Sequence, residues 1–214
     1  MKKGCIFDLD GTLLDTIHTI AMYGNRALAQ YGLSAIDVET YKILVGNGAK
    51  NLVHRMLVQV GADDAMFDEV FATYDAMYMA APLEITKPYD GILDLLAALG
   101  EREIQTAVLS NKQHHVTSEI VPKFFGDSFS VCLGQREGVA IKPDPVGVFK
   151  ILDGWGIDAA DCLYVGDTGT DMQTGKNAGA FTVGVTWGFR KKEELLENGA
   201  DAIVDHPMDI ISLL

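Results

Sequence analysis

The chain has 214 residues, of which 48% are hydrophobic and 22% are charged, so a disordered or fibrous polypeptide is excluded. At ~100–200 residues per domain, this length predicts one domain, or one domain that carries a second, smaller one. The formal net charge of −13 argues against nucleic acid and anionic membranes as partners, because both are bound through Lys and Arg side chains.

The cysteines and the N-terminal residues indicate in which cellular compartment the protein is found. Cys5, Cys132 and Cys162 are odd in number and lie in or beside apolar runs, so we expect buried, reduced thiols and no disulfide framework. Asp8 and Asp10 stand where a signal peptide needs an apolar core, and no run approaches the ~20 apolar residues of a membrane span. We therefore expect a soluble, cytoplasmic protein without a membrane partner.

Short apolar runs alternate with helical patterns along most of the chain. The predicted strands are Gly4–Leu9, Ile104–Leu109, Phe129–Leu133, Cys162–Val165, Phe181–Val185 and Ala202–Val204. The predicted helices are Gly91–Leu99, Gln113–Val121, Val146–Trp155, Asp171–Ala178 and Lys191–Glu197. This alternation is typical of an α/β fold with a parallel sheet flanked by helices, in which ligands bind beyond the carboxyl ends of the strands.

One interval, from about Asp15 to Ala81, shows helical patterns and no strand. Its features are an apolar stripe from Leu13 to Leu28 with Asp15 as cap and Gly32 as stop, a second stripe over Ala49–Val60, and a third helix over Ala65–Ala81 that is broken by Pro82. We expect an inserted helical domain at 15–82 and a catalytic core made of 1–14 and 83–214.

Four polar stretches follow four of the predicted strands. They are Asp8-Leu9-Asp10-Gly11-Thr12, Ser110-Asn111, Lys142-Pro143-Asp144-Pro145 and Gly166-Asp167-Thr168-Gly169-Thr170-Asp171. Strand alternation should point Asp8 and Asp10 the same way. Ser110 and Asn111 should open a helix and offer a hydroxyl and backbone donors to a phosphate oxygen.

The charges of these stretches indicate a reaction. Four aspartates, Asp8, Asp10, Asp167 and Asp171, would meet with Lys142 as the one offsetting charge, and like charges so close cannot all ionise without a cation or a shared proton. An all-oxygen ligand set with room for water suits Mg²⁺. Carboxylates, metal, hydroxyl and lysine together favour phosphoryl transfer from a small phosphorylated metabolite through an aspartyl-phosphate.

In order and spacing, the four stretches resemble the four motifs of the haloacid dehalogenase (HAD) superfamily, over essentially the whole chain. Val45-Gly46-Asn47-Gly48-Ala49, Lys87-Pro88-Tyr89-Asp90-Gly91 and Val185-Thr186-Trp187-Gly188 resemble its phosphoglycolate phosphatase branch. The resemblance implies a Rossmann-like core with a helical cap, Mg²⁺ as cofactor, and hydrolysis of a phosphate monoester, with 2-phosphoglycolate as the best candidate.

The resemblance also implies roles for the first motif. Asp8 would be the nucleophile and a metal ligand. Asp10 would be the general acid and then the base, with its backbone carbonyl on the metal. Branches that cleave C–halogen or C–P bonds lack an acid two residues after the nucleophile, so Asp10 makes those reactions improbable. Thr12 fits the phosphatase pattern better than that of β-phosphoglucomutase.

The resemblance implies roles for the other three motifs as well. Ser110, Asn111 and Lys142 would hold the transferring phosphoryl group, and Asp167 would complete the metal site. Asp171 would hold a metal-bound water or orient Lys142.

Within the insert, Gly46-Asn47-Gly48 is the element expected to move, with Asn47 and Lys50 as candidate contacts to the leaving group. Lys50 and His54 lie four residues apart, so a solvated helix face explains them equally well. His114 and His115 should be surface residues, because neighbours on a helix diverge by ~100°.

Three other functions use similar residues. A β-phosphoglucomutase-like enzyme would return the phosphoryl group to a sugar, and a pyrophosphatase or nucleotidase would share the core. A receiver-like signalling module also combines acids, a hydroxyl and a lysine around Mg²⁺. That module would leave the inserted helices and Asp10 without a task.

Overall fold

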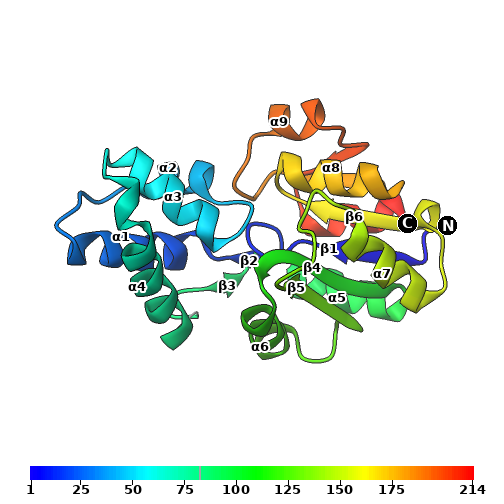
Figure 1. Ribbon diagram of the computed structural model, residues 1–214. Helices are drawn as coiled ribbons and strands as arrows, with labels where there is room; N and C mark the ends of the chain where they lie inside the picture. The colour runs from blue at the N-terminus through cyan, green and yellow to red at the C-terminus, as the bar shows by residue number, and fades with distance from the viewer. Residues whose placement is uncertain (82) are drawn as a thin grey trace. The chain divides into compact units, whose positions relative to one another are not determined.

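The computed structural model describes residues 1–81 and 83–214 (Figure 1). The chain forms two compact units, one made of Met1–Asp15 with Pro88–Leu214 and the other of Thr16–Lys87. No helix in these described ranges combines the length and the apolar character that a membrane span needs. We describe each unit by itself.

The first unit contains a sheet in which all paired neighbours are parallel, as the alternating pattern predicts. Its strands are β1 (Gly4–Phe7), β4 (Gln105–Gln113), β5 (Val131–Gln135), β6 (Cys162–Gly166), β7 (Phe181–Val185) and β8 (Ala202–Val204), in the order β5-β4-β1-β6-β7-β8. Phe7 at the end of β1 pairs with Val108 and Val165. The residues that follow β1 therefore lie between those that end β4 and β6.

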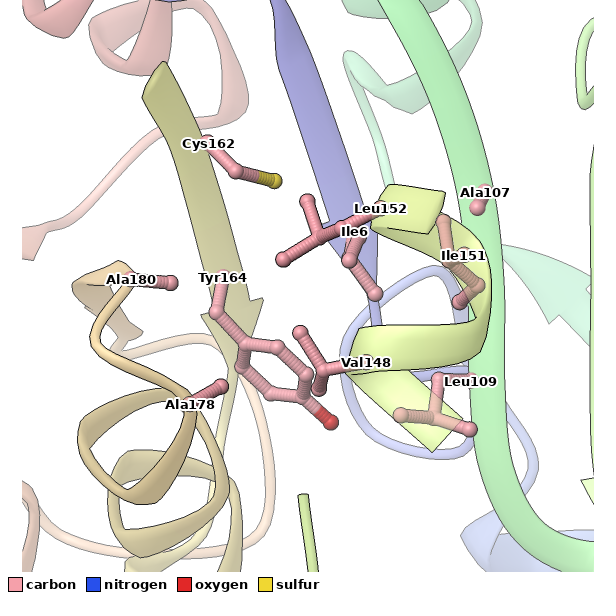
Figure 2. Packing of buried hydrophobic residues seen from close by; sticks show 10 residues of the cluster. All are labelled: Ile6, Ala107, Leu109, Val148, Ile151, Leu152, Cys162, Tyr164, Ala178 and Ala180. Atoms are coloured by element: carbon pink, nitrogen blue, oxygen red, sulfur yellow. The ribbon is translucent and has the colours of Figure 1, made fainter. Parts of the chain in front are cut away.

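Helices flank this sheet (Figure 1). They are α5 (Ile92–Glu101), α6 (His114–Phe125), α7 (Val146–Trp155), α8 (Gly169–Ala178) and α9 (Lys192–Glu197), with short 3-10 segments at Ala159–Asp161 and Pro207–Leu213. Figure 2 shows side chains converging from β1, β4, β6 and α7 in one buried cluster, among them Ile6, Tyr164 and Val148. This packing holds the strand ends in fixed positions.

Strand β4 continues past its predicted end, and this corrects one expectation. Ser110 and Asn111 lie within β4, and α6 begins only at His114, so the prediction that they open a helix is wrong. The pairing with β5 is irregular between Leu109 and Gln113. The Ser110 hydroxyl accepts a hydrogen bond from the Lys112 N–H at 3.2 Å, which gives the extended backbone a local partner there.

The second unit is mainly helical in its described part. It contains α1 (Ile17–Gln30), α2 (Val38–Leu44), α3 (Ala49–Gln59), a 3-10 turn at Asp64–Met66 and α4 (Phe67–Ala80). The strands β2 (Leu14–Asp15) and β3 (Lys87–Pro88) stand at the two boundaries. The expected break at Pro82 lies outside the described residues.

One expectation about this unit was wrong, and one helix was not predicted. Thr16, and not Asp15, occupies the cap position of α1, and it makes no side-chain capping bond. Helix α2 was not predicted, because its seven residues bury only Tyr41 and Leu44. Its clearest signal is Asp37, whose side chain accepts from the Thr40 N–H at 2.8 Å.

The cysteines are free, as predicted. Cys5 and Cys162 are buried, but Cys132 is only half-buried, which corrects the expectation for that residue. Burial raises the pKa of the Cys132 thiol to about 11, so it stays protonated near neutral pH.

Candidate functional site

Three carboxylates meet at the carboxyl edge of the sheet. Asp8 follows β1, Asp167 follows β6, and Asp171 lies in the first turn of α8. Each offers an oxygen within 4.8 Å of the others, and all three residues are buried. We predicted that four aspartates would meet. Three of them do, and the carboxylate of Asp10 lies outside this group.

The burial of this cluster raises the pKa of two of its members. Burial, then the charge of Asp171, raises the pKa of Asp8 to about 7, although Lys142 opposes the shift. Burial, then Asp171 and Asp8, raises the pKa of Asp167 well above its usual value. Burial is the main cause of both shifts, and the mutual repulsion of the carboxylates adds to it. A cation between these oxygens would offset both effects, so the donor set fits a divalent metal that prefers oxygen ligands.

Lys142 is the cation nearest this cluster. Its Nζ donates to Asp171 Oδ1 at 2.7 Å and lies 2.8 Å from Asp8 Oδ1. Asn111 fixes the Lys142 backbone from both sides: Asn111 Oδ1 accepts from the Lys142 N–H at 2.9 Å, and Asn111 Nδ2 donates to the Lys142 carbonyl at 3.1 Å. The Asn111 side chain therefore anchors Lys142.

Asp171 has partners on both oxygens. Its Oδ2 accepts from the Thr168 N–H at 3.1 Å and from the Thr168 hydroxyl at 2.6 Å, in a capping box at the start of α8. Its Oδ1 accepts from Lys142. This geometry supports the expected role in orienting Lys142.

Asp167 accepts hydrogen bonds from two groups, and the sequence analysis predicted neither contact. Its Oδ2 accepts from the Phe189 N–H at 2.8 Å, and its Oδ1 accepts from the Thr12 hydroxyl at 3.0 Å. Two glycines allow this close packing: a Cβ on Gly11 would lie 2.3 Å from Asp167 Oδ2, and one on Gly188 would lie 2.2 Å from Asp167 Cβ. The φ of +89° at Gly11 also favours glycine there.

We expect Gly188→Ala to lower kcat/KM by at least about tenfold and to destabilise the fold by about 1–3 kcal/mol. The added methyl would also lie 2.4 Å from the Gly11 carbonyl, so the backbone or Asp167 must move. Steady-state kinetics and thermal unfolding measure both effects. Gly154→Ala is the control, because a Cβ there meets nothing within 4 Å. Normal kinetics in Gly188→Ala would contradict this account of Asp167.

Asp10 is bound by a lysine that the sequence analysis did not identify. Lys112 Nζ lies 3.0 Å from Asp10 Oδ2 and 3.1 Å from Oδ1, with both side chains largely buried. Lys112 stands two residues after Ser110, in the irregular part of β4 that continues past the predicted end of the strand. Ser110 itself is 5% exposed.

The remaining candidates have local partners. Lys50 Nζ lies 5.9 Å from the centre of the Phe71 ring. His54 Nδ1 is 2.8 Å from Asp64 Oδ1, and its ring stacks on Phe67 at 3.7 Å, so a purely solvated face does not describe it. Asn47 has a φ of +60°, and its carbonyl accepts from Asn51 Nδ2 at 2.7 Å.

One of the two adjacent histidines also departs from its prediction. His114 is half-buried and contacts the Gly134 N–H and Arg136, so the surface prediction is wrong for it, whereas His115 is exposed as predicted.

Known proteins resemble this chain along nearly all of its length. A family model described as haloacid dehalogenase-like hydrolase matches residues 5–185. The phosphoglycolate phosphatase of Rhodospirillum rubrum is 34% identical over 96% of this chain and 88% of its own length. The N-acetylmuramic acid 6-phosphate phosphatase of Pseudomonas aeruginosa is 29% identical over 99% of this chain and 94% of its own length. A crystal structure from Lactobacillus delbrueckii covers the whole chain and 98% of its own with a TM-score of 0.93 and 31% identity.

Proposed function

The chain belongs to the haloacid dehalogenase-like hydrolase family, and we propose that it hydrolyses a small phosphate monoester through a phosphorylated Asp8. The observation that carries this proposal is the position of Asp8. Its Oδ1 accepts from the Leu9 N–H at 2.7 Å and lies 2.8 Å from Lys142 Nζ, so the carboxylate is fixed just after β1 and can attack phosphorus there.

We propose Mg²⁺ as the cofactor, held by the carboxylates of Asp8 and Asp167 and the backbone carbonyl of Asp10. The buried, crowded carboxylates fit such an ion. When bound, it supplies positive charge that lets a phosphate dianion approach the acidic cluster. Asp171 contributes by holding Lys142.

In the first half-reaction, a carboxylate oxygen of Asp8 forms a bond to phosphorus while the bond from phosphorus to the leaving-group oxygen breaks. The Lys142 ammonium and the Ser110 hydroxyl hold oxygens of the transferring group. Asp10 gives a proton to the departing alkoxide. In the second half-reaction, Asp10 takes a proton from water as that water attacks phosphorus. The Asp8 carboxylate and inorganic phosphate are then released.

We propose 2-phosphoglycolate as the first substrate to test, because it is the substrate in the name of the relative from Rhodospirillum rubrum. The Pseudomonas aeruginosa relative is named for a phosphorylated sugar acid, so similarity at this level spans different leaving groups. We propose that the helical insert, taken as 15–82, selects among them, with Asn47 and Lys50 as contacts. A β-phosphoglucomutase-like reaction and a pyrophosphatase or nucleotidase reaction remain alternatives.

A screen of phosphorylated metabolites with phosphate release as the readout tests this proposal. We expect release from 2-phosphoglycolate or a related phosphorylated acid without an added sugar bisphosphate. Turnover that needs a sugar bisphosphate and releases no phosphate would support the mutase. No turnover of any phosphate ester or anhydride would overturn an enzymatic role.

A further inference from the structure

Lys112 contacts the residue proposed to act on the leaving group. Its Nζ lies within 3.1 Å of both oxygens of Asp10, and the two side chains are 10% and 15% exposed. An ammonium placed across both carboxylate oxygens has the geometry of a close ion pair. Neither the four motifs nor the mechanism above gives Lys112 a task.

We propose that Lys112 is a specificity-determining residue that binds a carboxylate, or another anionic group of similar size, on the leaving group of the substrate. This inference rests on the proposed function, because it needs Asp10 to serve the leaving-group oxygen. It assigns the substrate to a chemical class, the phosphate monoesters of small hydroxy acids.

The distances place Lys112 within reach of such a group. A leaving-group oxygen that accepts a proton from Asp10 lies about 3 Å from an Asp10 oxygen, and hence no more than about 6 Å from Lys112 Nζ. In a 2-hydroxy acid the carboxylate is one carbon away from that oxygen. It can therefore contact the Lys112 ammonium while Asp10 keeps its own contact with the leaving-group oxygen.

The charges of the site favour the same assignment. Asp8, Asp167 and Asp171 form an acidic cluster that repels an anionic leaving group, and the Lys142 ammonium is engaged by Asp8 and Asp171. Lys112 instead contacts Asp10, the residue proposed to protonate the leaving group. The end of β4 then supplies Ser110 to the phosphoryl group and, two residues later, Lys112 to the leaving group.

The test compares two substrates that differ in one group, 2-phosphoglycolate and ethyl phosphate. We expect Lys112→Met to lower kcat on both by a common factor, because Asp10 loses its ion pair. We expect KM to rise at least about tenfold for 2-phosphoglycolate and by less than about twofold for ethyl phosphate. In Lys112→Arg, the KM for 2-phosphoglycolate should stay close to the wild-type value, since arginine keeps the positive charge.

Lys176→Met is the matched control, because it also removes a lysine from a Lys–Asp ion pair, with Asp201, away from the site. It should change neither KM. An equal rise of KM on both substrates in Lys112→Met would overturn the inference and leave the proposed function standing. A selective rise in Lys50→Ala with none in Lys112→Met would also overturn it and move the anion contact to the helical unit. A wild-type enzyme inactive on both substrates would overturn the proposed function, and the inference with it.

Discussion

Asp8→Asn should abolish the hydrolysis of phosphate monoesters, with a loss of about 10⁴-fold or more in kcat, because an amide cannot form the acyl phosphate. The structure supports this choice of residue: Asp8 lies at the end of the central strand, and its Oδ1 is fixed by Leu9 and Lys142. Rapid quenching followed by intact-mass measurement should find a phosphorylated wild-type protein and no phosphorylated Asp8→Asn. A phosphoenzyme in the variant would contradict the assignment of the nucleophile.

The stability of Asp8→Asn shows whether activity is lost with the nucleophile or through misfolding. The pKa of Asp8 is raised to about 7 in the folded protein, mainly by burial, so ionising Asp8 costs folded-state stability as pH rises from about 4 to 7. Without metal, Asp8→Asn should therefore be at least as stable as the wild type at pH 8, and its advantage should vanish below pH 4. Thermal unfolding at both pH values checks this. A lower Tm than wild type at pH 8 would attribute the lost activity to the fold.

Asp10→Asn is the matched variant, two residues away, and it should fail differently. The nucleophile is intact, so the phosphoenzyme still forms, but its hydrolysis lacks a base for water. General acid–base catalysis contributes ~10²–10⁴-fold to a rate, so we expect kcat to fall by a factor in this range. The phosphoenzyme should accumulate. The two variants together therefore test the separate roles proposed for the two carboxylates.

The α/β fold could be predicted because its signal is local. The strands β7 and β8 appear in the sequence as short apolar runs, and their observed bounds match the predicted ones. The end of β4 could not be predicted, because Ser110 and Asn111 favour turns and helix starts as much as strands. Helix α2 is too short and too polar for its apolar residues to show a helical periodicity.

The site likewise has a part that could be predicted from the sequence and a part that could not. Asp8, Asp167 and Asp171 carry charge at strand ends and helix starts, so their convergence follows from topology. The Lys112–Asp10 pair depends on how far β4 extends, and the Phe189 N–H reaches Asp167 from a loop 22 residues further along. Neither contact has a signal in composition or period.

Removing divalent metal should abolish activity, and Mg²⁺ should restore it. Lys142 contacts two of the three buried carboxylates and offsets one of their charges, so the bound dianion of a phosphate ester would add to an unbalanced negative charge. Ca²⁺ should support activity poorly, because its longer and looser coordination misplaces the nucleophile. Full turnover in excess chelator would contradict this metal site.

Metal binding should also be visible without turnover. At 100 times its Kd, Mg²⁺ should stabilise the fold by about 2.7 kcal/mol, measured as a rise in Tm. At one fixed Mg²⁺ concentration, the rise should be larger at pH 8 than at pH 5.5, because the raised pKa values of Asp8 and Asp167 make protons compete with the metal at the lower pH. Asp167→Asn should lose most of the Mg²⁺-dependent rise, whereas Lys176→Met should keep it. An equal rise in the wild type and in Asp167→Asn would place the ion elsewhere in the molecule.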